Sequence, residues 1–209
     1  MILPVEPLVL LSFIPAGLAL NLTPGVDMMF CLGQGLRGGP RAGMAANLGI
    51  AAGGLVQVTL AGLGLGALVA AHPMAFEAIR WVGVVYLLVL AFGALRGGVA
   101  KVAEVQTLPV GAVFRQGLLV NLFNPKVILF ILAFLPQFVD PARAVLPQFL
   151  TLGAVFCLGG LVVNGVVGVM AGGIGRRLAQ SEGLSLWLGR VSAGIFAGLA
   201  VRLALMQRG

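Results

Sequence analysis

The sequence carries very little charge. Only 9% of its 209 residues are Asp, Glu, Lys or Arg, whereas 60% are hydrophobic and the mean hydropathy is +1.10. A soluble domain carries roughly a quarter charged residues, so this chain cannot cover a water-facing surface. The scarcity of charge excludes an ordinary soluble protein. It predicts an all-α membrane protein in which residues 1–209 form a single transmembrane domain.

Cysteine and histidine are also scarce. The chain has two cysteines, Cys31 and Cys157, each inside an apolar run, and one histidine, His72, beside a proline. No CxxC pair is present, so neither a disulfide framework nor a zinc-type spacing is predicted. One histidine and six carboxylates cannot supply a nucleophile–base–orienter set. We therefore expect no catalytic residues, no metal site and no cofactor.

The charge that remains is mostly positive, with a net charge of +7. The cations are scattered between apolar runs and form no basic face, which argues against nucleic acid as a partner. They gather near Arg37 and Arg41, near Arg96, and at Arg176 and Arg177. Cytoplasmic loops of membrane proteins are rich in Lys and Arg. This rule places these three loops in the cytoplasm and both termini outside, in a bacterial inner (plasma) membrane.

Long apolar runs are what the sequence does have. A membrane-spanning helix needs about 20 apolar residues, and we expect six. They cover residues 8–35, 44–71, 76–95, 114–138, 145–173 and 187–205, with a polar loop at 96–113.

Two of these runs are interrupted by proline beside polar side chains. Proline removes a backbone donor, and a break in a membrane helix persists only where protein or a wet cavity surrounds it. The breaks are therefore predicted to line a path for solute. An alternative is that their amides only satisfy the broken backbone. The candidate binding and translocation residues are Asn21, Thr23, Pro24, Gly25, Asp27, Asn121, Asn124, Pro125 and Lys126.

Two of the candidates are ionisable. An isolated charge at the centre of a membrane helix costs roughly 2.5–3.5 kcal/mol, so we expect Asp27 and Lys126 to face one shared cavity. The helix ends at the breaks add partial charges that suit a zwitterion. Because burial favours the neutral form of a carboxyl group, Asp27 is also the candidate for proton coupling.

The two breaks also suggest an internal repeat. Asn21 and Asn121 lie 100 residues apart, and three helices precede the polar loop as three follow it. Halves with an odd number of spans have opposite orientations, as in many secondary transporters. We therefore predict two inverted repeats, at about 1–95 and 114–209, joined by the loop at 96–113, with broken first and fourth helices.

Glycines recur at helical spacing. The pairs predicted to permit close helix packing are Gly49 with Gly53, Gly62 with Gly66, Gly168 with Gly172 and Gly194 with Gly198. The stretch from Gly33 to Gly38 matches G-x-G-x-x-G, but it lacks the preceding strand that a dinucleotide site requires. We interpret it as a flexible cytoplasmic turn.

Several of these motifs together resemble the LysE/RhtB family of amino-acid exporters, of the homoserine/threonine efflux type. The first is Thr23-Pro24-Gly25 with Asp27. The others are the glycine-rich continuation from Gly35 to Gly53, Gly83-x-x-Tyr86-Leu87, and the run from Gly117 through Asn121, Asn124-Pro125-Lys126 and Phe134-Leu135-Pro136. The resemblance covers nearly the whole chain.

The resemblance implies a six-helix inner-membrane exporter of amino acids, coupled to protons and often dimeric. Val26 departs from the family, which usually has a second proline there, and Gln57 stands where many members have a histidine. Asp27 is closer to the homoserine/threonine branch than to the lysine branch, so a neutral substrate is expected. Export of metal ions or other small solutes, and electron transfer by thiols, remain as alternatives.

Overall fold

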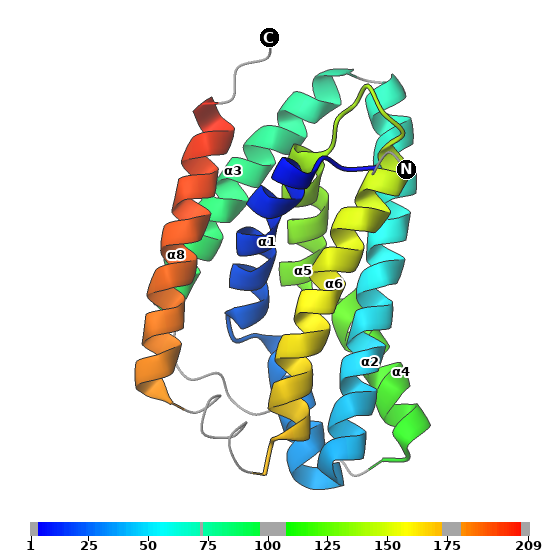
Figure 1. The fold of residues 1–209 in the computed structure, drawn as a ribbon, viewed down its shortest axis with the longest axis vertical. Helices are drawn as coiled ribbons and strands as arrows, with labels where there is room; N and C mark the ends of the chain where they lie inside the picture. The colour runs from blue at the N-terminus through cyan, green and yellow to red at the C-terminus, as the bar shows by residue number, and fades with distance from the viewer. Residues whose placement is uncertain (1–3, 72, 97–107, 173–180, 206–209) are drawn as a thin grey trace.

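The described part of the chain is a bundle of helices and contains no strand. The computed structural model describes residues 4–71, 73–96, 108–172 and 181–205. Figure 1 shows long helices running side by side, with both termini toward one end of the bundle. The elements are α1 (Pro7–Leu22), α2 (Val26–Ala71), α3 (Pro73–Leu95), α4 (Val110–Leu122), α5 (Pro125–Leu129), η1 (Phe130–Phe134), η2 (Leu135–Phe138), α6 (Val145–Val169) and α8 (Glu182–Leu205).

α2 is two helices joined by a tight turn. Gly39 has φ 74° and ψ −174°, a backbone conformation that is accessible to glycine and strained for other residues. Pro40 follows and starts the second helix with its fixed φ. Figure 1 shows the resulting hairpin at the end of the bundle opposite the termini. The second helix thus begins before residue 44, where the apolar run predicted it.

The interpretation of residues 33–38 as a turn is wrong. These residues are helical, and the turn falls at Gly39. A side chain at Gly35 would collide with the backbone of Gly168. The glycine is therefore needed for close approach between α2 and α6.

Glycines fix how α2 packs against its two main neighbours, α4 and α6. A Cβ on Gly49 would collide with the Phe114 carbonyl, and one on Gly53 would lie 2.8 Å from the Leu118 carbonyl. The packing role predicted for this pair is thereby confirmed. The pair on α8 is different, because a Cβ on Gly194 or on Gly198 would meet nothing within 4 Å.

A column of phenylalanine rings fills the space between α1, η1, η2 and α6. Phe130 lies between Phe134 and Phe156, with both centroid distances 4.9 Å. Phe13 lies 5.2 Å from Phe138 and 6.1 Å from Phe130. Aromatic pairs at these distances stabilise a core beyond the area they bury. The column holds α1 against the π-helical segment η1.

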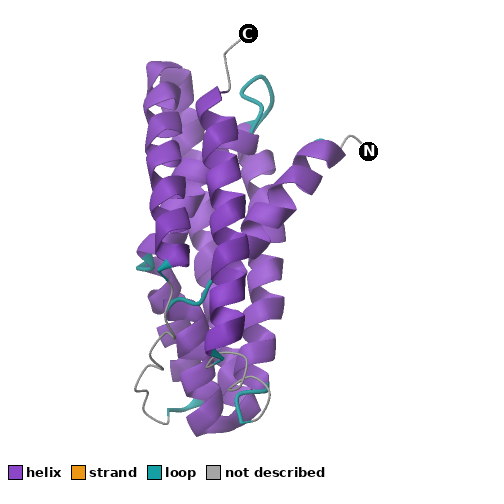
Figure 2. Ribbon diagram, turned by 90° about the vertical axis from the view of Figure 1, so that its left-hand side faces the viewer, coloured by secondary structure: helices purple, strands orange, loops and turns teal. Residues whose placement is uncertain are grey.

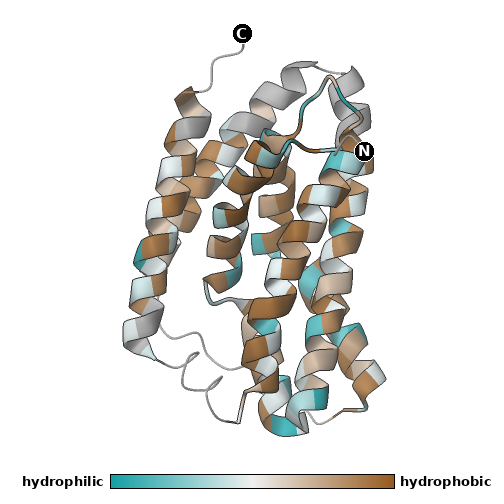
Figure 3. Cartoon of the chain, viewed as in Figure 1, coloured by the Kyte–Doolittle hydropathy of each residue, from teal (hydrophilic) through white to brown (hydrophobic). Residues whose placement is uncertain are grey.

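The outer faces of the bundle are apolar. Large exposed hydrophobic side chains include Val85 and Phe92 on α3, Val162 on α6 and Trp187 on α8. Figure 3 shows hydrophobic residues along most of the length of the helices, with hydrophilic residues at the hairpin of α2 and in the loop before α6. A water-soluble monomer rarely exposes so large an apolar surface. Lipid is the solvent that fits it.

By length and composition, two of the described helices could each cross a membrane, Val26–Gly64 and Val145–Val169. The broken pair Val110–Leu122 and Pro125–Phe138, bent by 50°, adds a third span if counted as one. Shorter apolar helices cover Pro7–Leu22, Trp81–Leu95 and Leu186–Val201. Figure 2 shows several long helices running along one direction and the tilted start of α1 beside the N-terminus, whereas α3 crosses the bundle obliquely in Figure 1. The apolar helices fit a multi-pass membrane protein.

Replacing a glycine with alanine should have opposite effects on stability at a packed position such as Gly49 and at an open position such as Gly194. Gly49→Ala forces α2 and α4 apart, and overpacking of this kind costs about 1–3 kcal/mol. Gly194→Ala adds a methyl group in open space and improves helix propensity by up to about 1 kcal/mol. Thermal unfolding of the purified protein should therefore show a lower Tm for Gly49→Ala and an unchanged or higher Tm for Gly194→Ala. Equal Tm values would contradict this account of the packing.

Candidate functional site

The first predicted break separates α1 from α2. Helix α1 ends at Leu22, and Thr23 has the extended conformation φ −69°, ψ 115°. The Thr23 backbone N–H and hydroxyl both donate to the Ala19 carbonyl, at 3.1 and 2.6 Å. Helix α2 then starts at Val26. The chain therefore leaves the helix for three residues even though Val26 replaces a proline of the family motif.

The second break separates α4 from α5. Asn124 is extended, and its side-chain oxygen accepts a hydrogen bond from the Lys126 backbone N–H at 3.0 Å. Asparagine is a favoured residue for capping a helix in this way. Pro125 follows as the first helical residue, where its missing N–H costs nothing. The sequence Asn-Pro-Lys thus ends one helix and begins the next.

Lys126 joins the second break to the first. Its ammonium group donates to the carbonyls of Leu20 and Thr23, both at 2.7 Å. The last carbonyls of a helix have no partner within that helix, and a cation there also interacts favourably with the helix dipole. Lys126 therefore caps α1 from a hundred residues away in the sequence.

Asp27 receives the reciprocal interaction. Asn121, at the end of α4, donates its side-chain amide to the Asp27 carboxylate at 2.9 Å. Asp27 lies in the first turn of α2, where the positive end of the helix dipole stabilises an anion. Each break thus supplies a polar side chain to the other.

Neighbouring helices satisfy the remaining backbone groups. Gln57 donates to the Asn121 carbonyl and Tyr86 to the Lys126 carbonyl, both at 2.7 Å. The Ser192 hydroxyl donates to the Ala19 carbonyl at 3.2 Å. Gln57, at the position where the family often has a histidine, therefore serves the broken backbone.

Two small polar cavities lie at this crossing. One, of about 30 Å³, is lined by both Asp27 and Lys126, so the two ionisable groups face one cavity. The other, of about 20 Å³, adjoins Asn121. Each has room for about one water molecule. Of the predicted residues, those lining one or both cavities are Asn21, Thr23, Gly25, Asp27, Asn121, Asn124 and Lys126; Pro24 and Pro125 line neither.

Two further asparagines belong to the site and are absent from the residues predicted from the sequence. Asn47 is fully buried and donates to the Leu161 carbonyl at 2.7 Å. Asn164 is 6% exposed and lines both cavities. Both amides interrupt apolar runs, and a polar residue inside a membrane span is by itself a sign of function. A search for polar residues within the apolar runs, without the requirement for a nearby proline, would have found both.

Several buried oxygens at the crossing have no hydrogen-bond partner among the described residues. They are Asp27 Oδ1, Asn47 Oδ1, Asn121 Oδ1 and Gln57 Oε1. Buried polar atoms are nearly always paired. A set of unpaired acceptors beside a polar cavity suits a ligand or water molecules that donate hydrogen bonds.

Both cysteines are buried and unpaired. No group of three or more His, Cys, Asp or Glu side chains that could hold a metal ion occurs in the described ranges. His72 lies outside the described residues.

A multi-helix apolar bundle that encloses a polar crossing of two helix breaks has the construction of a membrane transport protein. The sequence profile of the LysE type translocators matches residues 18–207. The chain belongs to this family, and it is a membrane transport protein rather than an enzyme.

Relatives with named functions are efflux proteins. The chain is similar to a homoserine/homoserine lactone efflux protein of Salmonella typhimurium, with 34% identity over 69% of this chain and 71% of the relative. It is also similar to a leucine efflux protein of Salmonella choleraesuis, with 27% identity over 94% of both. An uncharacterized membrane protein of Vibrio cholerae is 32% identical over 93% of this chain and 95% of the relative. No solved structure matches the chain.

The bond between Asn121 and Asp27 can be measured with a double-mutant cycle. Unfolding free energies of Asn121→Leu, Asp27→Leu and the double variant, from SDS titration in mixed micelles, should show a coupling of about 0.6–2 kcal/mol. The control cycle pairs Asn121→Leu with Thr151→Ala, because the Thr151 hydroxyl donates to the Pro147 carbonyl of its own helix. The control should show no coupling, and additive effects in both cycles would contradict the cross-break bond.

Proposed function

We propose that the protein exports amino acids or close derivatives from the cell by proton antiport. The expected substrate is a neutral amino acid of the homoserine or threonine type rather than lysine. The observation that carries this proposal is the presence of one carboxylate and one ammonium, Asp27 and Lys126, on a single polar cavity inside an apolar bundle. The efflux functions for which the relatives are named support it.

The charges of the cavity match those of a zwitterion. The ammonium group of a substrate finds acceptors in Asp27 Oδ1 and Asn121 Oδ1, which have no partner among the described residues. Its carboxylate finds Lys126 and the amide donors of Asn21 and Asn164. A lysine substrate brings a second cation, for which the described cavity walls offer no second carboxylate. Electrostatic matching therefore favours a neutral amino acid.

Proton coupling is assigned to Asp27. A carboxylate that binds either a proton or the substrate ammonium, and not both, links the two fluxes in opposite directions. Asn121 bonds to only one of the two carboxylate oxygens. The other oxygen has no partner among the described residues, and we assign it to the proton or the substrate. Asp27 in this role makes the exchange of substrate for proton obligatory.

The proposed architecture has six spans in two inverted repeats. Helix α1 and residues 26–38 form a broken first span, residues 40–71 a second and α3 a third. The run from α4 to η2 forms the broken fourth span, followed by α6 and α8. Lys126 of the second break caps α1, and Asn121 of the second break bonds to the Asp27 side chain of the first. Such contacts are expected when discontinuous helices of two repeats meet near the midplane. The proposed repeats cover about 1–95 and 114–209, with the start of the second moved to Val110, where α4 begins.

The proposed orientation has both termini in the periplasm. Arg37 and Arg41 flank the Gly39 turn, at the end of the bundle opposite the termini (Figure 1). The positive-inside rule assigns that end to the cytoplasm of a bacterial inner membrane. We also propose that two copies associate in the membrane, through the apolar outer faces.

Both central cavities are too small for an amino acid, since each has room for about one water molecule. Binding of an amino acid therefore requires the walls of these cavities to move apart. Export by alternating access then requires the two repeats to move relative to one another.

Asp27→Asn tests the proton assignment. The amide keeps an oxygen that can accept from Asn121 but loses the ability to carry a proton. In proteoliposomes, we expect Asp27→Asn to lose amino-acid accumulation driven by a pH gradient, while wild-type protein accumulates homoserine or leucine. Counterflow exchange without a pH gradient distinguishes proton binding from substrate binding by Asp27. Exchange by Asp27→Asn persists if Asp27 binds only the proton, and it stops if Asp27 also binds the substrate. Gradient-driven flux at the wild-type level would remove Asp27 from the mechanism.

The thiol alternative is tested by the variant Cys31→Ser, Cys157→Ser. Both thiols are buried in packed positions, and serine is close to cysteine in volume. We expect the variant to retain most of the amino-acid flux of the wild type. Loss of flux with an unchanged Tm would favour thiol electron transfer instead. Growth of a deletion strain on metal salts, with and without the gene, tests metal export.

A further inference from the structure

A third cavity, far larger than the two central ones, lies at the end of the bundle that carries the start of α1. It has a volume of about 240 Å³ and lies between the start of α1, η2 and the loop before α6. We call it the terminal cavity and define it by Glu6, Ser12, Gln137, Asp140, Arg143 and Gln148. Its size is somewhat below that of sites for drug-sized ligands, which fits a small molecule.

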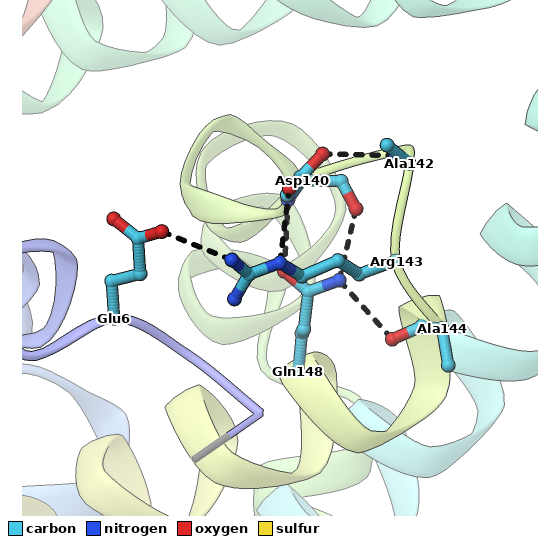
Figure 4. A network of polar contacts seen from close by, with 6 residues as sticks. All are labelled: Glu6, Asp140, Ala142, Arg143, Ala144 and Gln148. Atoms are coloured by element: carbon cyan, nitrogen blue, oxygen red, sulfur yellow. Dashed lines mark hydrogen bonds and ion pairs between the residues drawn. The ribbon is translucent and has the colours of Figure 1, made fainter. Parts of the chain in front are cut away.

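The terminal cavity contains charges of both signs. The Arg143 guanidinium donates to the Glu6 carboxylate at 3.1 Å and lies 3.3 Å from the Asp140 carboxylate (Figure 4). The side chains of Arg143 and Glu6 are 43% and 62% exposed. Ion pairs this exposed contribute little to stability. The pair is therefore easily exchanged for another pair of charges.

The loop that presents Arg143 is held in place, whereas Glu6 is not. Gln148, which is 2% exposed, accepts from the Asp140 backbone N–H and donates to the Asp140 and Ala144 carbonyls. Asp140 also accepts from the Ala142 N–H. Glu6 stands at the start of α1 and makes no capping bond with its side chain. Figure 4 shows these residues of the loop and of α6 around the guanidinium, with Glu6 reaching it from the opposite side.

Gln137 is a further polar residue of the terminal cavity. Gln137 donates its amide to the Ala133 carbonyl, but its Oε1 is buried and has no partner among the described residues. An unpaired acceptor in a cavity that also contains the Glu6 carboxylate matches a ligand group with several N–H donors. An ammonium group has three N–H donors, so it can bond to an amide oxygen and to a carboxylate.

The phenylalanine column separates the terminal cavity from the central ones. Phe138 lines the terminal cavity and Phe156 lines both central cavities. Phe13 and Phe130, each with no exposed surface, link the two through successive ring contacts. The terminal cavity is thus a distinct place on the far side of an apolar barrier.

We propose that the terminal cavity is a second binding site for a zwitterionic amino acid, whose ammonium and carboxylate replace the partners in the Glu6–Arg143 ion pair. A zwitterion can take the place of both partners at once and leaves neither charge unpaired. A simple anion at Arg143 leaves Glu6 without its partner, and a simple cation at Glu6 leaves Arg143 with Asp140 alone. The terminal cavity lies where exported substrate would arrive after it has passed the phenylalanine column. This assignment rests on the proposed export function.

Protection of an introduced thiol tests this site without measuring transport. Ser12 lines the terminal cavity, and Ser12→Cys places a thiol there, whereas Cys31 and Cys157 are buried and the wild-type chain measures their background labelling. In nanodiscs, a ligand at ten times its Kd leaves about one site in eleven free, so labelling by a charged thiol reagent should slow about tenfold. Homoserine or leucine should protect. Their N-acetyl derivatives and the corresponding amino alcohols should not.

Matched variants separate binding from a structural ion pair. Glu6→Gln and Arg143→Gln, each combined with Ser12→Cys, should lose the protection while their Tm stays near that of Ser12→Cys. Protection that survives Arg143→Gln, or protection by the amino alcohol alone, would overturn the proposal. Val9→Cys, which also faces the cavity, replaces Ser12→Cys if that variant does not fold.

Counterflow measured on the same wild-type preparation distinguishes the two proposals. Flux without protection overturns the terminal site and leaves the export function standing. Protection without flux supports the terminal site and contradicts export of that amino acid.

Discussion

The structure depends on two helix breaks that complete each other. A helix that stops inside an apolar bundle leaves carbonyl groups that no water can reach. Lys126, at the start of α5, supplies two hydrogen bonds to the end of α1, at Leu20 and Thr23. Asn121, at the end of α4, in turn bonds to Asp27 at the start of α2. These bonds join the first break to the second, so the position of one half of the chain is tied to the position of the other.

Lys126 bonds to backbone carbonyls at the first break and also lines the central cavity. These bonds explain how an ammonium group can be held inside an apolar bundle. Lys126 at a bare helix end costs less than an isolated ammonium in lipid, because the carbonyls replace part of its hydration. Hydrogen bonding to the broken backbone does not explain why Asp27 Oδ1 and Asn121 Oδ1 have no partner among the described residues. A kink that served only the fold would have no need of a carboxylate. The excess of acceptors over donors is what favours a ligand site.

The sequence was sufficient to locate the breaks, because proline beside amides inside an apolar run interrupts a helix where lipid cannot satisfy the freed backbone. It also predicted that Asp27 and Lys126 face one cavity. It could not predict that Lys126 bonds to carbonyls of α1 or that Gln57 bonds to the Asn121 carbonyl, since both depend on how distant helices are rotated. The turn was misplaced for a related reason. Gly35 serves a contact with Gly168, and a glycine needed for packing looks in sequence like one needed for a turn.

The phenylalanine column and the hydrogen bonds between the two breaks involve the same segments, α1 and the run from α5 to η1. The packing that separates the cavities is therefore connected to the bonds that hold the breaks together. Phe13 lies on α1, whose end is capped by Lys126, and Phe130 begins η1 four residues after Lys126. η1 is a π-helix, a rare form that is frequent at functional sites. In the proposed function, a substrate carboxylate would compete with the carbonyls of Leu20 and Thr23 for Lys126. The ring contact between Phe13 and Phe130 joins the same segments of the chain, α1 and the run from α5 to η1, so release of Lys126 would remove one of the contacts that hold this part of the phenylalanine column together.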